Sequence, residues 1–288
     1  MIPGSPRFDN RPAAARGRQN QRPRPMLPYP TIDPVILRLG PLQVRWYGLM
    51  YVLGFSASYL LVRHQVSKFR LTRLGEHVDN LNLALIVSLV LGARLGYVLF
   101  YNPAYYFAHP AEIPATWEGG MSFHGALVGL LLGGYLYCRR AKLDFLQTAD
   151  VYIVTTPIGL GLGRLGNFIN GELFGRVTDV PWAMVFPQGG PLPRHPSQLY
   201  ESLLEGVVLF LLLWTAKNSY WRRGWRQGSL LALFLIGYGL IRTLVECFRE
   251  PDAQLGFLFG LFTMGQLLSS LMIGAGLLLL LRRPKAAP

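Results

Sequence analysis

The chain has 288 residues, of which 51% are hydrophobic and only 15% are charged, and its formal net charge is +13. Average soluble domains carry about 25% charged residues, so the composition argues against an ordinary soluble protein. Nucleic-acid binding is also disfavoured, because the basic residues fall mainly in short loops between apolar runs. Such loops indicate a membrane topology.

The first 25 residues differ from the rest of the chain. Residues 1–25 are rich in proline and arginine and contain no apolar run, so we expect them to be disordered and to carry no cleavable signal peptide. Met26 opens a plausible natural start. We therefore interpret 1–25 as a non-native leader and 26–288 as one membrane domain.

Seven apolar segments are long enough to cross a bilayer, since a spanning helix needs about 20 residues. The predicted fold class is an all-α polytopic membrane protein with seven transmembrane helices. Between the fourth and fifth helices, residues 165–197 are predicted to form a small head domain with a strand-like centre at 182–186. The predicted spans are 46–63, 80–101, 121–138, 147–165, 198–216, 228–248 and 257–281.

Basic residues alternate between the loops and predict the orientation. They gather after the first, third, fifth and last spans, whereas residues 102–120 contain no lysine or arginine. The positive-inside rule places the basic loops in the cytoplasm, with the natural N-terminus and the head in the periplasm and the C-terminus in the cytoplasm. The arginines of the leader oppose this orientation, but four later loops agree on it. The basic loop residues are Arg63, Lys68, Arg70, Arg73, Arg139, Arg140, Lys142, Lys217, Arg222, Arg223, Arg226, Arg282, Arg283 and Lys285.

Neither cysteine belongs to a metal-binding spacing. Cys138 and Cys247 end different apolar segments, and we interpret both as buried thiols on opposite membrane sides, too far apart for a disulfide. The sequence also shows no nucleotide-binding loop and no Ser-His-Asp arrangement. We therefore expect no metal and no cofactor.

Polar side chains from six predicted helices fall at one depth, in the outer half of the membrane. An arginine at a helix centre costs about 2.5–3.5 kcal/mol on insertion scales, so the chain is expected to use its membrane arginines. Two arginines at one level predict a site for an anion such as a lipid phosphate. The six residues are Tyr47, Arg94, His124, Arg164, Glu201 and Arg242.

Local spacing extends this set. Tyr238, Arg242 and Glu246 are four residues apart and share one helix face, and Arg164 shares a face with Asn167. The glycines around them allow close backbone approach and predict a helix break near residue 170.

Structural roles are alternatives for single residues. Arg242 and Glu246 are also consistent with an ordinary intrahelical ion pair. Arg94 is equally consistent with a structural role, and a lone histidine such as His124 is more often an interhelical hydrogen-bonding group than a base. Asp150 is interpreted as an interfacial residue.

Six segments together resemble bacterial prolipoprotein diacylglyceryl transferases. The resemblance runs from about Leu27 to the basic C-terminal tail, and the glycine-rich fourth segment matches the family signature in full. The segments are RWYGLMY (45–51), GARLGYVLFYNP (92–103), GMSFHGALVG (120–129), GRLGNFINGELFGR (163–176), RHPSQLYE (194–201) and YGLIRTLVECFREPD (238–252).

The resemblance implies a reaction in the bacterial inner membrane. The diacylglyceryl group of phosphatidylglycerol is transferred to the thiol of a lipobox cysteine in a prolipoprotein signal peptide, a thioether forms and glycerol-1-phosphate leaves. Arg164 and Arg242 would hold the phosphate, and His124 is the first candidate for the base, with Tyr238 the second. The predicted substrate-binding residues are Tyr47, Arg94, Arg164, Asn167, Gly175, Glu201, Tyr238 and Glu246.

Two other functions compete with the enzyme. An anion or phospholipid transporter would need polar groups in both membrane halves, and the chain shows no convincing internal repeat. The other competing function is that of a non-catalytic lipid-binding scaffold.

Overall fold

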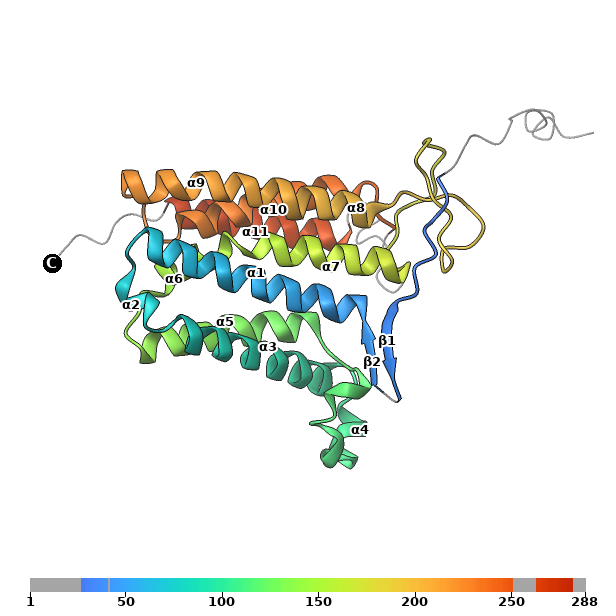
Figure 1. The fold of residues 1–288 in the computed structure, drawn as a ribbon, viewed down its shortest axis with the longest axis horizontal. Helices are drawn as coiled ribbons and strands as arrows, with labels where there is room; N and C mark the ends of the chain where they lie inside the picture. The colour runs from blue at the N-terminus through green and yellow to red at the C-terminus, as the bar shows by residue number, and fades with distance from the viewer. Residues whose placement is uncertain (1–26, 41, 251–262, 282–288) are drawn as a thin grey trace, which may run out of the picture.

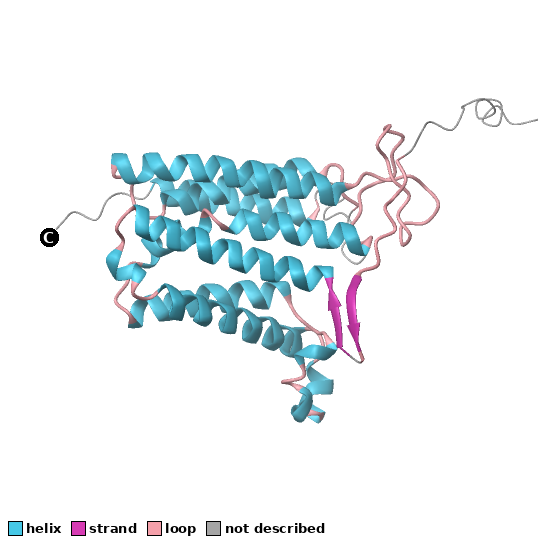
Figure 2. Cartoon of the chain, in the orientation of Figure 1, coloured by secondary structure: helices cyan, strands magenta, loops and turns pink. Residues whose placement is uncertain are grey.

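Helices dominate the computed structural model, which describes residues 27–40, 42–250 and 263–281. The predicted leader 1–25, part of the predicted span 257–281 and the basic tail lie outside the described residues. Most long helices run side by side along one axis (Figures 1 and 2). We call the end that carries the two strands the hairpin end, and the end that carries α2 (Thr72–Gly75) the opposite end.

A β-hairpin precedes the first long helix, and the sequence analysis did not predict it. Strands β1 (Val35–Leu39) and β2 (Leu42–Arg45) pair antiparallel. The carboxylate of Asp33 accepts a hydrogen bond from the Val35 N–H at 2.9 Å, which fixes the start of β1. Helix α1 (Trp46–Lys68) follows β2 directly, so the hairpin closes one end of the bundle.

Four helices of the described chain are long and apolar enough to cross a membrane. They are α3 (Val78–Phe100), the continuous helix Ser197–Arg223, α10 (Ser229–Glu246) and α11 (Met264–Leu281). The chain is thus mostly helical and has the character of a multi-pass membrane protein. Helices α1 and α5 (Phe123–Arg140) also form where spans were predicted, although they fall outside this apolar class.

The continuous helix Ser197–Arg223 changes its winding near its start. It consists of α8 (Ser197–Glu201), a π-helical stretch η4 (Ser202–Val208) and α9 (Leu209–Arg223). Short π-helical stretches inside α-helices are frequent at functional sites.

The fourth predicted span is wrong as a single helix. It forms two helices, α6 (Phe145–Ile153) and α7 (Thr156–Asn170). Pro157 lies in the first turn of α7, where its ring cannot continue a preceding helix. The break predicted near residue 170 is confirmed, because α7 ends at Gly171, whose φ of 68° is left-handed.

Two apolar clusters hold the bundle together. One joins α9 and α10 through Leu209, Leu213, Leu230 and Phe234, and the other packs α1 and α3 on α6 near the opposite end. Many large apolar side chains point outward, among them Leu240 and Leu244, which are more than half exposed. An apolar outer face is expected of helices that lie in lipid.

Three polar residues lie elsewhere than the sequence indicated. Asp150 is fully buried, not interfacial, and its carboxylate accepts hydrogen bonds from the N–H groups of Gly228 at 2.6 Å and Leu231 at 2.8 Å. Lys217 lies buried within α9 and not in a loop, with Nζ 2.8 Å from the Trp214 carbonyl oxygen. Cys247 is exposed at the end of α10, whereas Cys138 is buried; both are free thiols.

The predicted head contains no regular strand. Only Met184 of residues 182–186 pairs, in a single bridge with Arg194, because Pro181 and Pro187 bound this stretch and cannot donate. The segment is held by bridges from Val177 to Arg194 and from Gly175 to Arg249.

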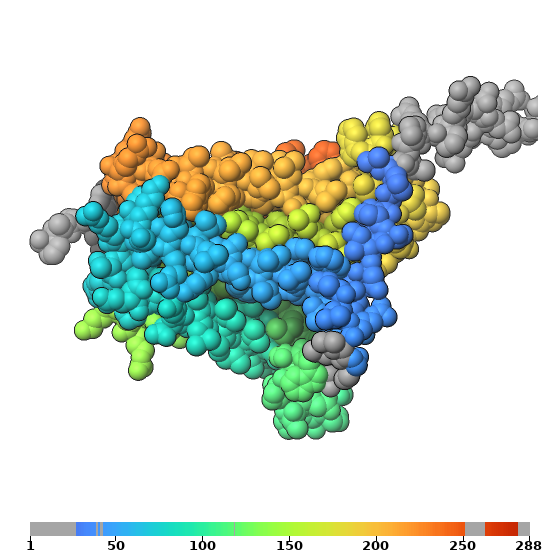
Figure 3. Space-filling view, in the orientation of Figure 1, coloured from blue at the N-terminus to red at the C-terminus, as the bar shows by residue number. Residues whose placement is uncertain are grey.

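A helical arm connects α3 to α5 and stands out from the hairpin end of the bundle (Figure 3). It contains α4 (Pro103–Ala108) and the short 3₁₀ turns η2 (Pro110–Glu112) and η3 (Thr116–Glu118). Phe107 and Trp117 of this arm are highly exposed.

Candidate active site

Five charged side chains meet inside the bundle near the hairpin end. We call them the arginine–glutamate cluster: Arg164 on α7, Glu201 on α8, Glu205 on η4, and Arg242 and Glu246 on α10. The glutamates are at most 6% exposed, Arg242 is 10% exposed and Arg164 is 20% exposed. Burial of so many charges is sustained only by mutual pairing.

Glu201 joins the two arginines. Its Oε2 lies 2.6 Å from Nε of Arg164 and 3.1 Å from a terminal nitrogen of Arg242. Glu205 lies slightly farther away, with its oxygens 3.8 Å from Arg164 and 3.4 Å from Arg242. One carboxylate oxygen thus sets the separation of the arginines.

Small residues bring these helices together. A Cβ on Gly161 would lie 3.0 Å from the Cα of Gly206, so α7 and η4 touch backbone to backbone. Gly161 is one turn before Arg164, and Gly206 directly follows Glu205. The close approach therefore places the Arg164 side chain against the carboxylates.

Arg242 is held from three directions. Besides Glu201 and Glu205, its second terminal nitrogen lies 3.0 Å from Oε2 of Glu246, the expected intrahelical pair. The Glu246 carboxylate in turn packs against Gly265 of α11, where a Cβ would be 2.8 Å from it. Arg242 is therefore an internal member of the cluster.

Arg164 differs from Arg242 in its free donors. Its contacts with Glu201 and Glu205 are made through Nε, and within the described part of the chain its two terminal nitrogens form no hydrogen bond. Because the side chain is also partly exposed, the open edge of its guanidinium can reach a ligand. A guanidinium edge with two N–H groups matches two oxygens of a phosphate.

An amide network lies beyond Arg164 at the end of α7. The Nδ2 atoms of Asn167 and Asn170 donate to the same Glu172 oxygen, at 2.9 and 3.0 Å. Gln198 donates to the Glu172 carbonyl oxygen at 2.7 Å, which ties this turn to α8. The side-chain amide of Asn167, three residues after Arg164, is therefore held in place by Glu172.

Gly175 is packed between backbone segments. Its N–H donates to the His195 carbonyl oxygen at 2.8 Å, and a Cβ there would lie 2.5 Å from the Phe248 carbonyl oxygen. This close packing alone requires glycine at position 175, whether or not a ligand binds there. A contact with the lipid headgroup stays a prediction.

The two predicted tyrosines flank the cluster helices. The Tyr47 ring packs on Gly166 of α7, and its hydroxyl lies 3.2 Å from that of Tyr51. Tyr238 is on the face of α10 that carries Arg242 and stacks on Phe234 at 5.7 Å between ring centroids.

Arg94 lies outside the cluster and anchors the arm. It is 4% exposed and donates to the carbonyl oxygens of Glu112, Ile113, Gly119 and Gly120 at 2.7–3.2 Å. These four hydrogen bonds support a structural role for Arg94, and its contact with the substrate stays a prediction.

His124 forms no hydrogen bond or ion pair with either arginine within the described part of the chain. It is exposed in the first turn of α5, next to Phe123, after the N-cap residue Ser122, which accepts from the Gly125 N–H. Helices α3 and α5 pack against each other on the other side of α1 from α10 (Figure 1). The structure thus joins four predicted residues, Arg164, Glu201, Arg242 and Glu246, by ion pairs, and among the described residues neither His124 nor Arg94 is paired with them.

Glu205 is the member of the cluster that the sequence analysis missed. A usable signal was present, because Glu205 follows Glu201 by four residues in an apolar segment and must share its face. Glu205 lies one turn deeper than the outer start of that span, outside the level that the other polar residues share.

Residues 34–282 match the family model described as prolipoprotein diacylglyceryl transferase. The chain belongs to this family. A phosphatidylglycerol–prolipoprotein diacylglyceryl transferase from Desulfotalea psychrophila is 60% identical over 252 residues, covering 87% of this chain and 93% of the relative. One from Geobacter sulfurreducens is 53% identical over 262 residues, covering 90% and 99%.

The matched residues 34–282 include every residue of the arginine–glutamate cluster and also the segment from Trp182 to Tyr200. In that segment His195 Nδ1 lies 3.1 Å from the Tyr200 hydroxyl, which also accepts from Trp182 at 2.6 Å. Burial lowers the pKa of His195 below its ordinary value. Among the described residues no group of His, Cys, Asp and Glu is arranged to hold a metal ion.

Proposed function

We propose that this chain transfers the diacylglyceryl group of phosphatidylglycerol to the cysteine thiol of a prolipoprotein lipobox. A carbon–sulfur bond forms at the glycerol carbon, the carbon–oxygen bond to the phosphate breaks, and glycerol-1-phosphate leaves. The proposal rests on family membership and on relatives at 50–60% identity that carry this name.

One structural observation supports a phosphate site within this function. Arg164 presents two terminal nitrogens without an acceptor in the described chain, while Glu201 holds its Nε. We assign the phosphate to this open edge, with Arg242 behind it as the fixed positive charge. A preorganised cation stabilises the negative charge that develops on the leaving phosphate.

The substrate supplies the nucleophile. A cysteine thiol has an ordinary pKa of about 8.5, so its proton must be taken up during transfer. His124 is the proposed base and Tyr238 the second candidate; the lipid must then extend from Arg164 toward α5. Tyr47, Asn167, Gly175, Glu246, Arg94 and Glu201 complete the proposed substrate site.

The proposed topology has seven membrane helices, the three beyond the four apolar ones being α1, α5 and the α6–α7 pair. Residues 165–197 are the periplasmic head, the natural N-terminus is periplasmic and the C-terminus is cytoplasmic. The hairpin end then faces the outer surface, which places the cluster near the outer leaflet. A cysteine-accessibility scan of loops at both ends tests this orientation.

The decisive assay supplies phosphatidylglycerol and a lipobox peptide to purified protein. The expected result is a thioether adduct with an equal amount of glycerol-1-phosphate. Lipid movement between leaflets without adduct would favour the transporter, and binding without either would favour the scaffold. Replacing both Cys138 and Cys247 by serine is expected to leave substantial activity, since the reacting thiol belongs to the peptide.

A further inference from the structure

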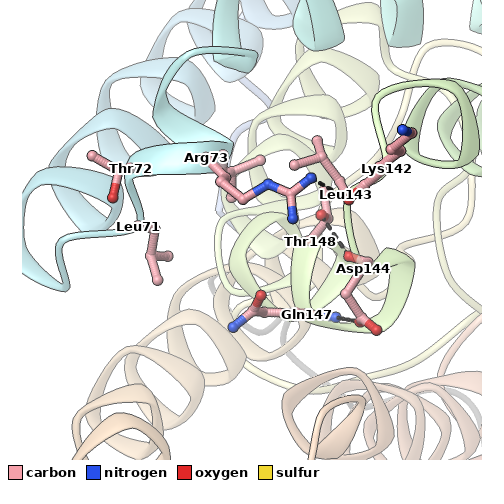
Figure 4. A pocket seen from close by; sticks show the side chains of 9 residues that line it. Leu71, Thr72, Arg73, Lys142, Leu143, Asp144, Gln147 and Thr148 are labelled. Atoms are coloured by element: carbon pink, nitrogen blue, oxygen red, sulfur yellow. Dashed lines mark hydrogen bonds between the residues drawn. The ribbon is translucent and has the colours of Figure 1, made fainter.

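A hollow of about 370 Å³ opens at the opposite end of the bundle, whereas the arginine–glutamate cluster lies near the hairpin end. It lies between the α1–α3 connection and the α5–α6 turn and is shown in Figure 4. Volumes of about 300–1,000 Å³ are usual for small-ligand sites. Its polar lining residues are Thr72, Arg73, Lys142, Asp144, Gln147 and Thr148.

Opposite charges line this hollow without pairing. Arg73 uses one terminal nitrogen to donate to the Lys142 carbonyl oxygen at 2.9 Å and forms no ion pair with any described residue. Asp144 likewise has no ion-pair partner in the described chain; its carboxylate accepts from the Gln147 N–H at 2.7 Å. In Figure 4 the Lys142 ammonium lies beyond Leu143, so Arg73 supplies the positive charge beside the hollow.

Both groups retain bonding capacity. A guanidinium has five N–H donors, of which Arg73 uses one. A carboxylate has about four acceptor positions. Besides the Gln147 N–H, the amide group of Gln227 lies 3.1 and 3.0 Å from the two oxygens, and it can donate to both when its nitrogen faces them. One acceptor position of Asp144 therefore stays open.

The two connections that flank the hollow adopt an uncommon backbone. Arg70 has φ of 53° and Lys142 has φ of 55°, both left-handed, where side chains other than glycine are disfavoured. Such strain persists only where surrounding contacts hold it. The Arg73–Lys142 hydrogen bond joins the two connections across the hollow.

We propose that this hollow binds a zwitterionic phospholipid headgroup in which a phosphate and a primary ammonium are joined by a short linker, as in phosphoethanolamine. The phosphate pairs with Arg73 and the ammonium with Asp144. The site lies where helices begin and end, the level at which lipid headgroups meet a membrane protein. A purely anionic headgroup would leave Asp144 unpaired, and a quaternary ammonium has no N–H for its oxygen.

The test uses the full-length protein in detergent, with native mass spectrometry to count retained short-chain lipids. Phosphatidylethanolamine, phosphatidylglycerol and phosphatidylcholine are compared in wild type, Arg73→Gln and Asp144→Asn. Asparagine still caps α6, so this change removes charge and keeps the helix start. Arg140→Gln is the matched control, because Arg140 is an exposed arginine at the same end that does not line the hollow.

The expected result is a phosphatidylethanolamine site weakened about tenfold, the effect of about 1.4 kcal/mol, by either charge-removing variant and unchanged in Arg140→Gln. Phosphatidylglycerol is also expected to bind at the arginine–glutamate cluster. The hollow is therefore assessed by the retained lipid that is lost in Arg73→Gln. Equal Arg73-dependent retention of all three lipids, or no effect of either variant, would overturn the proposal. Soluble phosphoethanolamine that competes as well as the lipid would make the free compound the ligand. Unchanged transferase activity shows that the variants are folded.

Discussion

Oε2 of Glu201 lies 2.6 Å from Nε of Arg164, and within the described part of the chain neither terminal nitrogen of this arginine forms a hydrogen bond. A second contact of the same oxygen, 3.1 Å to Arg242, fixes both arginines to one point. The cluster is therefore asymmetric. One arginine is enclosed by glutamates, and the other presents an open edge.

Arg164→Lys is expected to lower kcat/KM by about 10²–10³-fold, the size seen when a donor to a developing oxyanion is removed. A lysine can keep the ion pair with Glu201 but has no second edge for the phosphate. Steady-state kinetics with varied phosphatidylglycerol measure the effect. Arg38→Lys is the matched control at an arginine more than half exposed in β1, and equal activity in Arg164→Lys and this control would contradict the phosphate assignment.

Glu201→Gln is expected to destabilise the protein more than Glu205→Gln. Both residues are buried on one face, but Glu201 contacts the arginines at 2.6 and 3.1 Å and Glu205 at 3.4 and 3.8 Å. Removing one partner of a buried ion pair costs about 3–5 kcal/mol, so we expect Glu201→Gln to approach that range. Thermal unfolding in detergent gives the comparison; a reversed order would mean that Glu205 is the main counter-charge.

Arg94→Lys is expected to release the arm between α3 and α5. A lysine ammonium cannot reach the four carbonyl oxygens that the planar guanidinium spans, so several part-buried acceptors of the arm lose their donor. Limited proteolysis should cut residues 101–120 faster in the variant than in wild type. If cleavage is unchanged while binding of phosphatidylglycerol falls, Arg94 contacts the substrate instead.

The sequence predicted the level of the site but not its lateral arrangement. Helix rise fixes the height of a residue along its helix and predicts one level for Arg164, Glu201 and Arg242, whose side chains meet in the arginine–glutamate cluster. Depth does not determine which helices are neighbours, and α3 and α5 pair with each other on the far side of α1, away from α10. Depth alone therefore groups Arg94 and His124 with the arginines, whereas Arg94 binds the carbonyl oxygens of the arm and His124 has no hydrogen bond or ion pair with the arginines among the described residues.

Other differences have local causes. Pro157 divides the fourth predicted span, although the apolar run continues through it. Asp150 was assigned to an interface because a charge near a helix end usually meets water. Asp150 is buried instead, and two backbone N–H groups at the start of α10 supply the hydrogen bonds that water would otherwise give its carboxylate. Such long-range partners are not encoded in periodicity.

The segment that holds His195 is expected to loosen in acid. Burial lowers the pKa of His195, so the folded state favours the neutral ring. Its contribution to stability is complete above the ordinary histidine pKa of about 6.5 and is lost as the pH falls through the lower folded value. The protection factors of the Gly175 and His195 N–H groups, which correct for the slower intrinsic exchange at lower pH, should fall several-fold between pH 7 and pH 5, and His195→Gln should remove this dependence.

Asp150→Ala is expected to lower the free energy of unfolding by about 1–3 kcal/mol, the cost of leaving buried donors without a partner. The carboxylate accepts from the N–H groups of Gly228 and Leu231 and so caps α10 from another helix. Asp150→Asn keeps an oxygen for one of these donors and should lose less. Because α10 carries Arg242 and Glu246, the alanine variant should also lose activity at a lower temperature than wild type. Activity measured over a temperature series checks this, and an unchanged profile with normal kcat would show that α10 holds its position without the cap.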